Sequence, residues 1–245
     1  IKHYSANVIG PQVFPLLSYP KAWSPGVDAK ADVIFLDAKT DSALDTYRGK
    51  LKGRFILVND PREIKAHFDP EGTLLADSSL IKLANSDFPQ PRRRRCEMNP
   101  EQKARSPVEY HKMMLCQSEG AAGILGSSRG GDGGNIFVQQ ATVPTHPDTP
   151  ATRRINSYDP KAPKILPQIS VGAEQYNRLV RMIQKGEHPK LELNLEVAFT
   201  KEDSSYDILA ELPGSDLKDQ VVMIGGHFDS WHGGTGATDN ATGSA

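Results

Sequence analysis

The sequence is poor in cysteine, lacks a long apolar run and carries almost no net charge. Cys96 and Cys116 are its only cysteines and do not form a C-x-x-C pair, which excludes a cysteine-based zinc site. No apolar run approaches the ~20 residues that span a bilayer. The balance of 29 Lys+Arg against 30 Asp+Glu gives no electrostatic reason to expect nucleic-acid or membrane-surface binding.

What remains is the composition of a globular protein. At 245 residues, 38% hydrophobic and 24% charged, the chain has enough apolar material for one large domain or one and a half small ones. The first residue is Ile1 and no signal peptide follows it, so we expect any targeting segment to have been removed. The two cysteines are compatible with one disulfide in an exported protein or with two free thiols in a cytosolic one.

Hydrophobic spacing predicts alternating strands and helices over most of the chain. A clean alternation over residues 191–199 predicts a half-buried strand, and residues 173–185 form an amphipathic helix that ends at Gly186. A helix over 74–85 would be capped by Asp77 or Ser78. The remaining expected strands are 4–9, 31–38, 53–59, 120–127 and 165–171, and the remaining expected helices are 41–47 and 107–119.

A polar break at residues 201–205 is the best candidate for a domain boundary. After it, residues 206–212 and 221–225 are expected to form an antiparallel hairpin around the Pro213-Gly214 turn. A second polar stretch, 88–107, contains four consecutive arginines, Arg92–Arg95. A patch for a polyanion and a solvated loop are both possible there, and the flanking prolines and lack of aromatics favour the loop.

The residues with metal-binding chemistry gather in one segment, 225–245, directly after an apolar run. It places His227, Asp229, His232 and Asp239 within thirteen residues. Imidazole and carboxylate are the natural ligands of Zn²⁺ where no thiolate is present, and glycines let the backbone turn sharply near an ion. The competing interpretation is a glycine-rich turn with surface histidine and aspartate.

The residues of this segment are expected to play different parts. His227 and Asp239 are the candidate metal ligands, and Asp229 can accept the imidazole N–H of His227 and so fix its tautomer. His232 is either a further ligand or a residue of the rim, and the rim is favoured. Residues 233–243 lack the lysine of a P-loop and the Rossmann glycine fingerprint, which argues against a phosphate or nucleotide binder.

The pattern H-x-D-S-W followed by G-x-G-A-x-D-N-A-x-G resembles the di-zinc exopeptidases of the aminopeptidase and glutamate carboxypeptidase type. The resemblance implies that His227 binds one zinc, that Asp239 bridges two, and that Asp229 assists catalysis. It also implies a non-proline cis peptide bond between Asp239 and Asn240. The expected cofactor is Zn²⁺, two ions in a complete site.

The same resemblance implies an α/β fold with two parts. Residues 31–200 are similar to a protease-associated (PA) domain, with residues 1–30 as a segment leading into it. Residues 201–245 would then be the start of a zinc-peptidase domain of the phosphorylase/hydrolase-like α/β type, represented by its first strands only. The implied substrate is a peptide or dipeptide, and the implied location is secreted or periplasmic.

The chain departs from the family in one respect. The catalytic Glu and the remaining ligands of such enzymes follow the bridging Asp, whereas only six residues follow Asp239 here. We therefore expect an N-terminal fragment of a zinc exopeptidase, itself inactive, because two ligands are at most half of a zinc site. The alternative is a PA-type interaction or lid module without catalytic activity.

Overall fold

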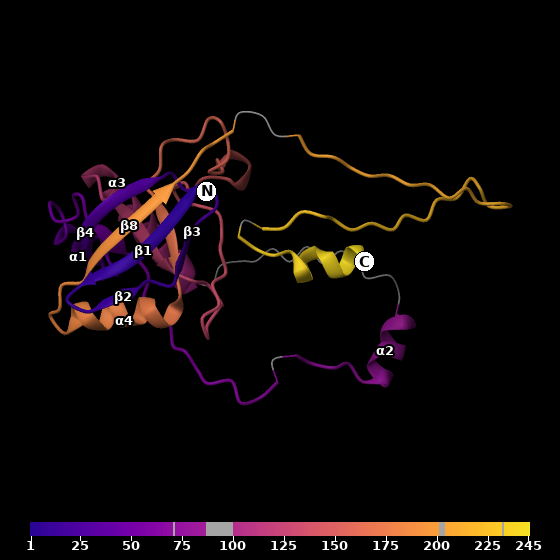
Figure 1. The fold of residues 1–245 in the computed structure, drawn as a ribbon, viewed down its shortest axis with the longest axis horizontal. Coiled ribbons are helices and arrows are strands. Elements are labelled where there is room, and N and C mark those ends of the chain that lie inside the picture. Colours follow the sequence, from indigo (N-terminus) through magenta and orange to yellow (C-terminus); the bar gives the residue numbers. More distant parts are fainter. Residues whose placement is uncertain (71, 87–99, 201–203, 232) are drawn as a thin grey trace.

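The computed structural model describes residues 1–70, 72–86, 100–200, 204–231 and 233–245, with the backbone alone at 100–106. Eight strands form one sheet in the order β2-β1-β8-β4-β5-β6-β7-β3 (Figure 1). Its two ends come together, since the Tyr4 hydroxyl in β1 lies 2.6 Å from the Ser18 hydroxyl in β3. The strands are β1 (His3–Gly10), β2 (Val13–Pro15), β3 (Ser18–Pro20), β4 (Val27–Phe35), β5 (Phe55–Leu57), β6 (Gly123–Ser127), β7 (Gln168–Val171) and β8 (Lys190–Glu196).

Half of this sheet is parallel and half antiparallel. Strands β4, β5, β6 and β7 run parallel in that order, so the loops after them meet at one edge. Strands β2, β1, β8 and β4 pair antiparallel, and β3 pairs antiparallel with β7. The mixed α/β class expected from the sequence is confirmed at this level.

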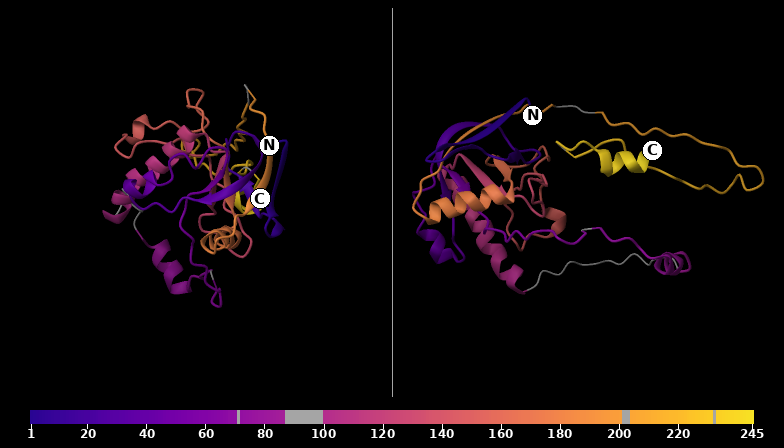
Figure 2. Two further views of the ribbon diagram at one scale, coloured as in Figure 1. Left: turned by 90° about the vertical axis from the view of Figure 1, so that its left-hand side faces the viewer. Right: turned by 60° about the horizontal axis from the view of Figure 1, so that its bottom comes forward.

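Helices cover both faces of the sheet (Figure 2). Helix α4 (Ala173–Gln184) lies against β4 and β6 and buries Tyr176, Leu179 and Val180 in the larger core cluster. On the opposite face, Leu44 of α1 (Asp41–Asp45) and Leu115 of α3 (Pro100–Glu119) pack in a second cluster. Because each face has its own apolar cluster, the sheet is the central layer of the fold.

Strand β8 shows why the pattern of alternation was informative. This strand lies between β1 and β4 in the sheet. Its side chains Leu191, Leu193 and Leu195 are 0–3% exposed and belong to the core. The strand ends at Glu196, short of the predicted residue 199. Phe199 is 56% exposed and stacks on Trp23, with ring centroids 6.1 Å apart.

Two local predictions are corrected, and a third is not tested. Helix α3 begins at Pro100 instead of residue 107, and Pro107 lies inside it, removing a backbone donor without ending the helix. Its first residue is a position where proline is well tolerated. Helix α2 (Asp77–Ala84) is capped by Ala76, not by Asp77 or Ser78, and has no side-chain cap hydrogen bond. The arginines Arg92–Arg95 lie outside the described residues.

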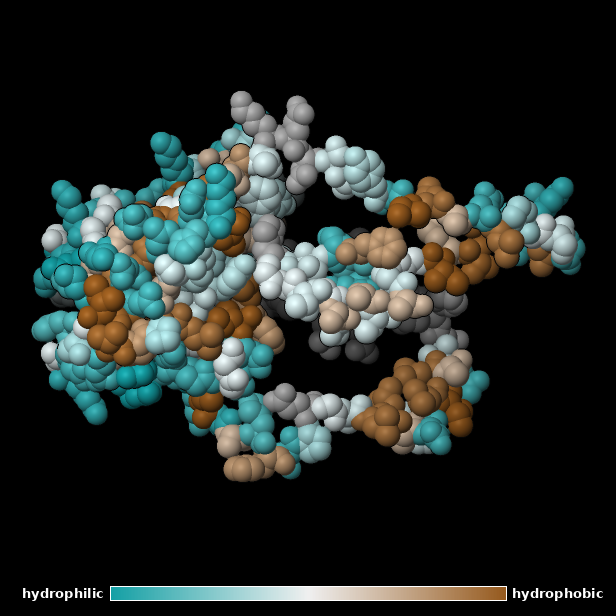
Figure 3. All heavy atoms as spheres, in the orientation of Figure 1, coloured by the Kyte–Doolittle hydropathy of each residue, from teal (hydrophilic) through white to brown (hydrophobic). Residues whose placement is uncertain are grey.

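The predicted hairpin after the polar break is also wrong. Residues 204–231 contain no strand, and the chain runs out from the sheet and returns without ladder pairing (Figure 1). An isolated two-stranded hairpin is marginal in water, because nothing covers its apolar side chains. Leu209, Leu212 and Ile224 are 92%, 95% and 94% exposed. Figure 3 shows hydrophobic residues gathered on the extended arm.

Two further findings concern membrane-spanning helices and the cysteines. No helix in the described ranges has both the length and the hydrophobicity to cross a membrane. Cys116 is a buried free thiol in α3, and burial raises its pKa to about 12. Of the two predicted alternatives, the free thiol of Cys116 agrees with unpaired cysteines, and Cys96 lies outside the described residues.

Candidate metal centre

The glycine-rich segment 225–245 turns back on itself, which brings its polar residues together. Gly233 and Gly236 have φ values of 76° and 72°, the left-handed region in which glycine is favoured. After Gly236 the chain forms a short helical turn over Ala237–Ala241 and Thr242–Ser244. Asp239, at φ −119° and ψ 89°, interrupts this turn, so its side chain leaves the helical path.

The imidazole of His227 lies between two carboxylates. Its Nδ1 is 2.9 Å from Asp229 Oδ1 and 3.1 Å from the Asp229 carbonyl oxygen. Its Nε2 is 2.9 Å from Asp239 Oδ1. The structure therefore brings the three predicted site residues together, although twelve positions separate His227 from Asp239 in the sequence.

These contacts alter the protonation of the histidine. Partial desolvation by itself lowers the pKa of His227, but the backbone and side-chain hydrogen bonds to Asp229 and the charge of Asp239 outweigh it. The net effect is a raised pKa of His227. Because a metal binds only an unprotonated imidazole nitrogen, an ion at Nε2 would compete with a proton there.

The two facing donors lie close enough to share one ion after a small movement. Zinc bonds of ~2.0–2.2 Å at a tetrahedral angle place a nitrogen and an oxygen ligand roughly 3.3–3.6 Å apart. The His227 Nε2 to Asp239 Oδ1 distance of 2.9 Å is a direct contact, so the two atoms would separate by about half an ångström to hold an ion between them. Asp229, on the other ring nitrogen, occupies the place of a carboxylate that orients a ligating histidine.

The short helical turn supports this arrangement through residues that the sequence analysis did not single out. The Ser244 hydroxyl lies 3.0 Å from the His227 carbonyl oxygen and 3.0 Å from that of Asn240. The peptide bond between Asp239 and Asn240 is cis, as the resemblance implied. A serine seventeen residues from His227 carries no local signal, because only the turn of the chain brings the two together.

Trp231 is 58% exposed, and His232 lies outside the described residues. The loop touches the sheet at Gly233, where a Cβ would come within 2.8 Å of the Tyr19 ring. Within the described ranges, no group of three or more His, Cys, Asp or Glu side chains is arranged to hold an ion by itself. His227 and Asp239 thus present two facing donors, fewer than the four ligands of a closed zinc site.

Comparison with known sequences points to one family. The model of Peptidase family M28 matches residues 207–245, the segment that contains all three site residues. Carboxypeptidase Q of Xenopus laevis is 36% identical over 86 residues, which are 35% of this chain and 18% of that enzyme. Carboxypeptidase Q of Homo sapiens is 33% identical over 89 residues, 36% of this chain and 19% of the enzyme. The aligned part is thus less than a fifth of these relatives.

Comparison with solved structures also finds a protein with a similar fold. The crystal structure of a peptidase M28 precursor from Shewanella amazonensis superposes on 96% of this chain and 43% of that chain, with a TM-score of 0.53 and 18% identity. The predicted resemblance to a peptidase of this kind is therefore confirmed: the chain matches the model of Peptidase family M28 over residues 207–245 and is similar to carboxypeptidase Q.

Proposed function

We propose that this chain is part of a zinc-dependent exopeptidase and contributes two ligands to a two-zinc site. The observation that carries the proposal is the convergence of His227 Nε2 and Asp239 Oδ1 at 2.9 Å, with the other imidazole nitrogen held by Asp229. The M28 match over the same residues supports it. The carboxypeptidase Q relatives support hydrolysis of a peptide or dipeptide at its end.

Each residue has a distinct task in this proposal. His227, through Nε2, and Asp239, through its carboxylate, would hold the zinc. Asp229 accepts the Nδ1–H of His227, which keeps the lone pair on Nε2 and raises its basicity. The chemistry that zinc supplies when bound is Lewis-acid polarisation of the scissile carbonyl and acidification of water. A general base and further ligands would come from residues outside these 245.

We further propose the domain organisation that the resemblance implies. Residues 31–200 form a PA-like domain, residues 1–30 lead into it and join its sheet through β1–β3, and residues 201–245 begin the peptidase domain. The exposed apolar side chains of residues 206–224 support the last point, since the central sheet of a peptidase domain would cover them. The proposed location is secreted or periplasmic.

The ligand assignment is tested by the zinc content of the longer parent protein. We expect His227→Ala and Asp239→Ala each to lower the zinc stoichiometry measured by mass spectrometry, whereas Asp219→Ala, a change in the same exposed segment, leaves it unchanged. Unaltered zinc in both site variants would refute the assignment. A zinc-free parent without peptide hydrolysis would instead favour the interaction or lid module. The 245-residue chain alone is expected to bind zinc weakly and hydrolyse nothing.

A further inference from the structure

A cavity of about 180 Å³ lies between helix α3 and the sheet, in a different part of the chain from His227 and Asp239. Its lining includes a lysine, a glutamate and a glutamine together with three apolar side chains: Lys21, Glu109, Gln168, Val58, Met113 and Ile124. The volume is below the roughly 300–1,000 Å³ of sites for drug-sized ligands. It is also far above the roughly 10–15 Å³ that one water needs, so the cavity has room for a small organic molecule.

The cavity owes part of its space to Gly126, next to the end of β6. A Cβ at this position would lie 3.2 Å from Asn59 Oδ1 and 4.0 Å from Lys21 Nζ. The absent side chain therefore leaves the lysine ammonium open to the cavity. Asn59 is held in place, because its Oδ1 accepts the backbone N–H of Ser127 at 3.1 Å.

Lys21 is the unusual group of this cavity. Within the described part of the chain, the structure gives its ammonium no carboxylate partner. Lys21 is half-buried, and burial lowers the pKa of its ammonium. A half-buried cation without a carboxylate partner can form a charge-assisted hydrogen bond with an anionic ligand in the cavity.

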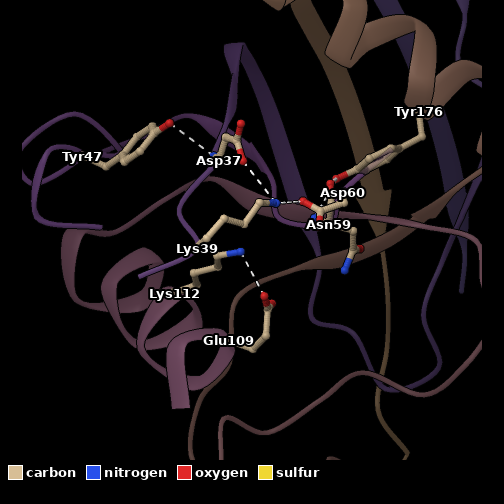
Figure 4. Close-up of polar contacts among 8 residues, drawn as sticks. All are labelled: Asp37, Lys39, Tyr47, Asn59, Asp60, Glu109, Lys112 and Tyr176. Atoms are coloured by element: carbon tan, nitrogen blue, oxygen red, sulfur yellow. Dashed lines mark hydrogen bonds and ion pairs between the residues drawn. The ribbon is translucent and has the colours of Figure 1, made fainter. Parts of the chain in front are cut away.

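The other charges nearby are already paired, as Figure 4 shows. Lys39 contacts both Asp37 and Asp60, and the buried Lys112 ammonium lies 3.0 Å from Glu109 Oε1. Glu109 is half exposed, with a side chain 50% accessible, and one carboxylate has about four acceptor positions. It can therefore accept a second cation while keeping Lys112.

These features select among ligands by charge. A phosphate dianion would be repelled by Glu109, and a simple cation by Lys21 and Lys112. We propose that the cavity binds a free α-amino acid, with its carboxylate on Lys21, its ammonium on Glu109 and its side chain against Val58, Met113 and Ile124. This site is separate from the peptidase centre and does not depend on the proposed function.

Calorimetric titration of the 245-residue chain with L-leucine tests the proposal. We expect saturable binding, weakened at least about tenfold by Lys21→Met, since a charge-assisted hydrogen bond is lost. Gly126→Ala should also weaken binding, because its methyl group enters the cavity. Lys39→Met, which removes a lysine at the same sheet edge but outside the cavity lining, should bind as the unaltered chain does.

Two leucine derivatives test the carboxylate contact with Lys21 and the ammonium contact with Glu109 separately. Leucine amide lacks the carboxylate and N-acetyl-leucine lacks the ammonium, so each should bind at least about tenfold more weakly than leucine. Circular dichroism of each variant verifies that it is folded. No heat of binding from leucine up to about 10 mM, equal binding by either derivative, or unchanged affinity in folded Lys21→Met would each overturn the proposal.

Discussion

The hydroxyl of Tyr176 in α4 and the backbone of Asn59 after β5 satisfy each other in both directions. The hydroxyl accepts the Asn59 N–H at 2.8 Å and donates to the Asn59 carbonyl at 2.8 Å. Tyr176 is fully buried, and burial raises the pKa of its phenol. One side chain thus ties the helix on one face to the loop at the carboxyl edge of the parallel strands (Figure 4).

Replacement of Tyr176 by Phe tests this tie. The change removes only the hydroxyl and leaves two backbone groups of Asn59 without a partner, so we expect the free energy of unfolding to fall by about 1–3 kcal/mol. Urea denaturation followed by circular dichroism measures the loss. Tyr206→Phe is the control, because Tyr206 is 86% exposed and its change should be neutral. Equal stability of the two variants would show that the hydroxyl of Tyr176 contributes nothing.

Glu119 makes the stability of the fold dependent on pH. Its carboxylate accepts the N–H of Gly49 at 2.6 Å and that of Leu51 at 3.0 Å, and these bonds lower its pKa. A carboxylate whose pKa is lowered by folding stabilises the protein fully above its unfolded value of about 4.3. That contribution disappears as the pH falls from about 5 through the lower folded value.

The matched variant for this effect is Glu119→Gln. We expect it to be less stable than the unaltered chain at pH 7, with a difference that shrinks as the pH falls below about 4.3. Denaturant unfolding at pH 7, 5 and 3.5 measures the difference. Glu211→Gln, in the exposed segment, should follow the unaltered chain at each pH. A constant gap between the Glu119 variant and the unaltered chain would contradict the linkage.

Asp229 is expected to act on zinc through His227. Asp229→Asn keeps the size of the side chain but weakens its hold on the imidazole Nδ1–H, so the zinc affinity of the parent protein should fall about 10–100-fold. Competition with a zinc-binding dye measures the affinity. Asp219→Asn should leave the affinity unchanged. An affinity that is equally unaffected by both changes would remove Asp229 from the site.

Leu193 and Leu209 both lie in stretches that the sequence pattern marks as strands, but only the first is covered. Leu193→Ala should destabilise the 245-residue chain by about 2–5 kcal/mol, because Leu193 is 0% exposed. Leu209→Ala should change stability by less than about 0.5 kcal/mol, because Leu209 is 92% exposed. Thermal and urea unfolding measure both, and a large loss in the Leu209 variant would show that residues 206–212 are packed.

The elements that the sequence predicted well are those with a strong local period. In helix α4, four of the apolar residues recur on one face, and Gly186 follows its end with φ 82°. The period that buries Leu191, Leu193 and Leu195 is equally local. The start of α3 was missed because Pro107 suggested a boundary, whereas the helix accommodates it.

The candidate site likewise contains residues that the sequence marks and contacts that only the structure shows. His227 and Asp239 are marked by the spacing of polar and glycine residues, which is a property of the sequence. The contacts of Ser244 with His227 and of Gly233 with Tyr19 join residues far apart in the chain. The cavity around Lys21 is of the latter kind, since residues 21, 109 and 168 come from three separate elements.

By itself, the sequence indicated which residues are candidates for the chemistry and where most helices and strands lie, because residue type and hydrophobic period act over a few neighbouring positions. Only the tertiary structure decided which carboxylate faces each nitrogen of His227, which side chains line the cavity beside Lys21, and which apolar runs are covered. Those outcomes depend on contacts between distant segments, whose geometry is set by packing across the whole sheet.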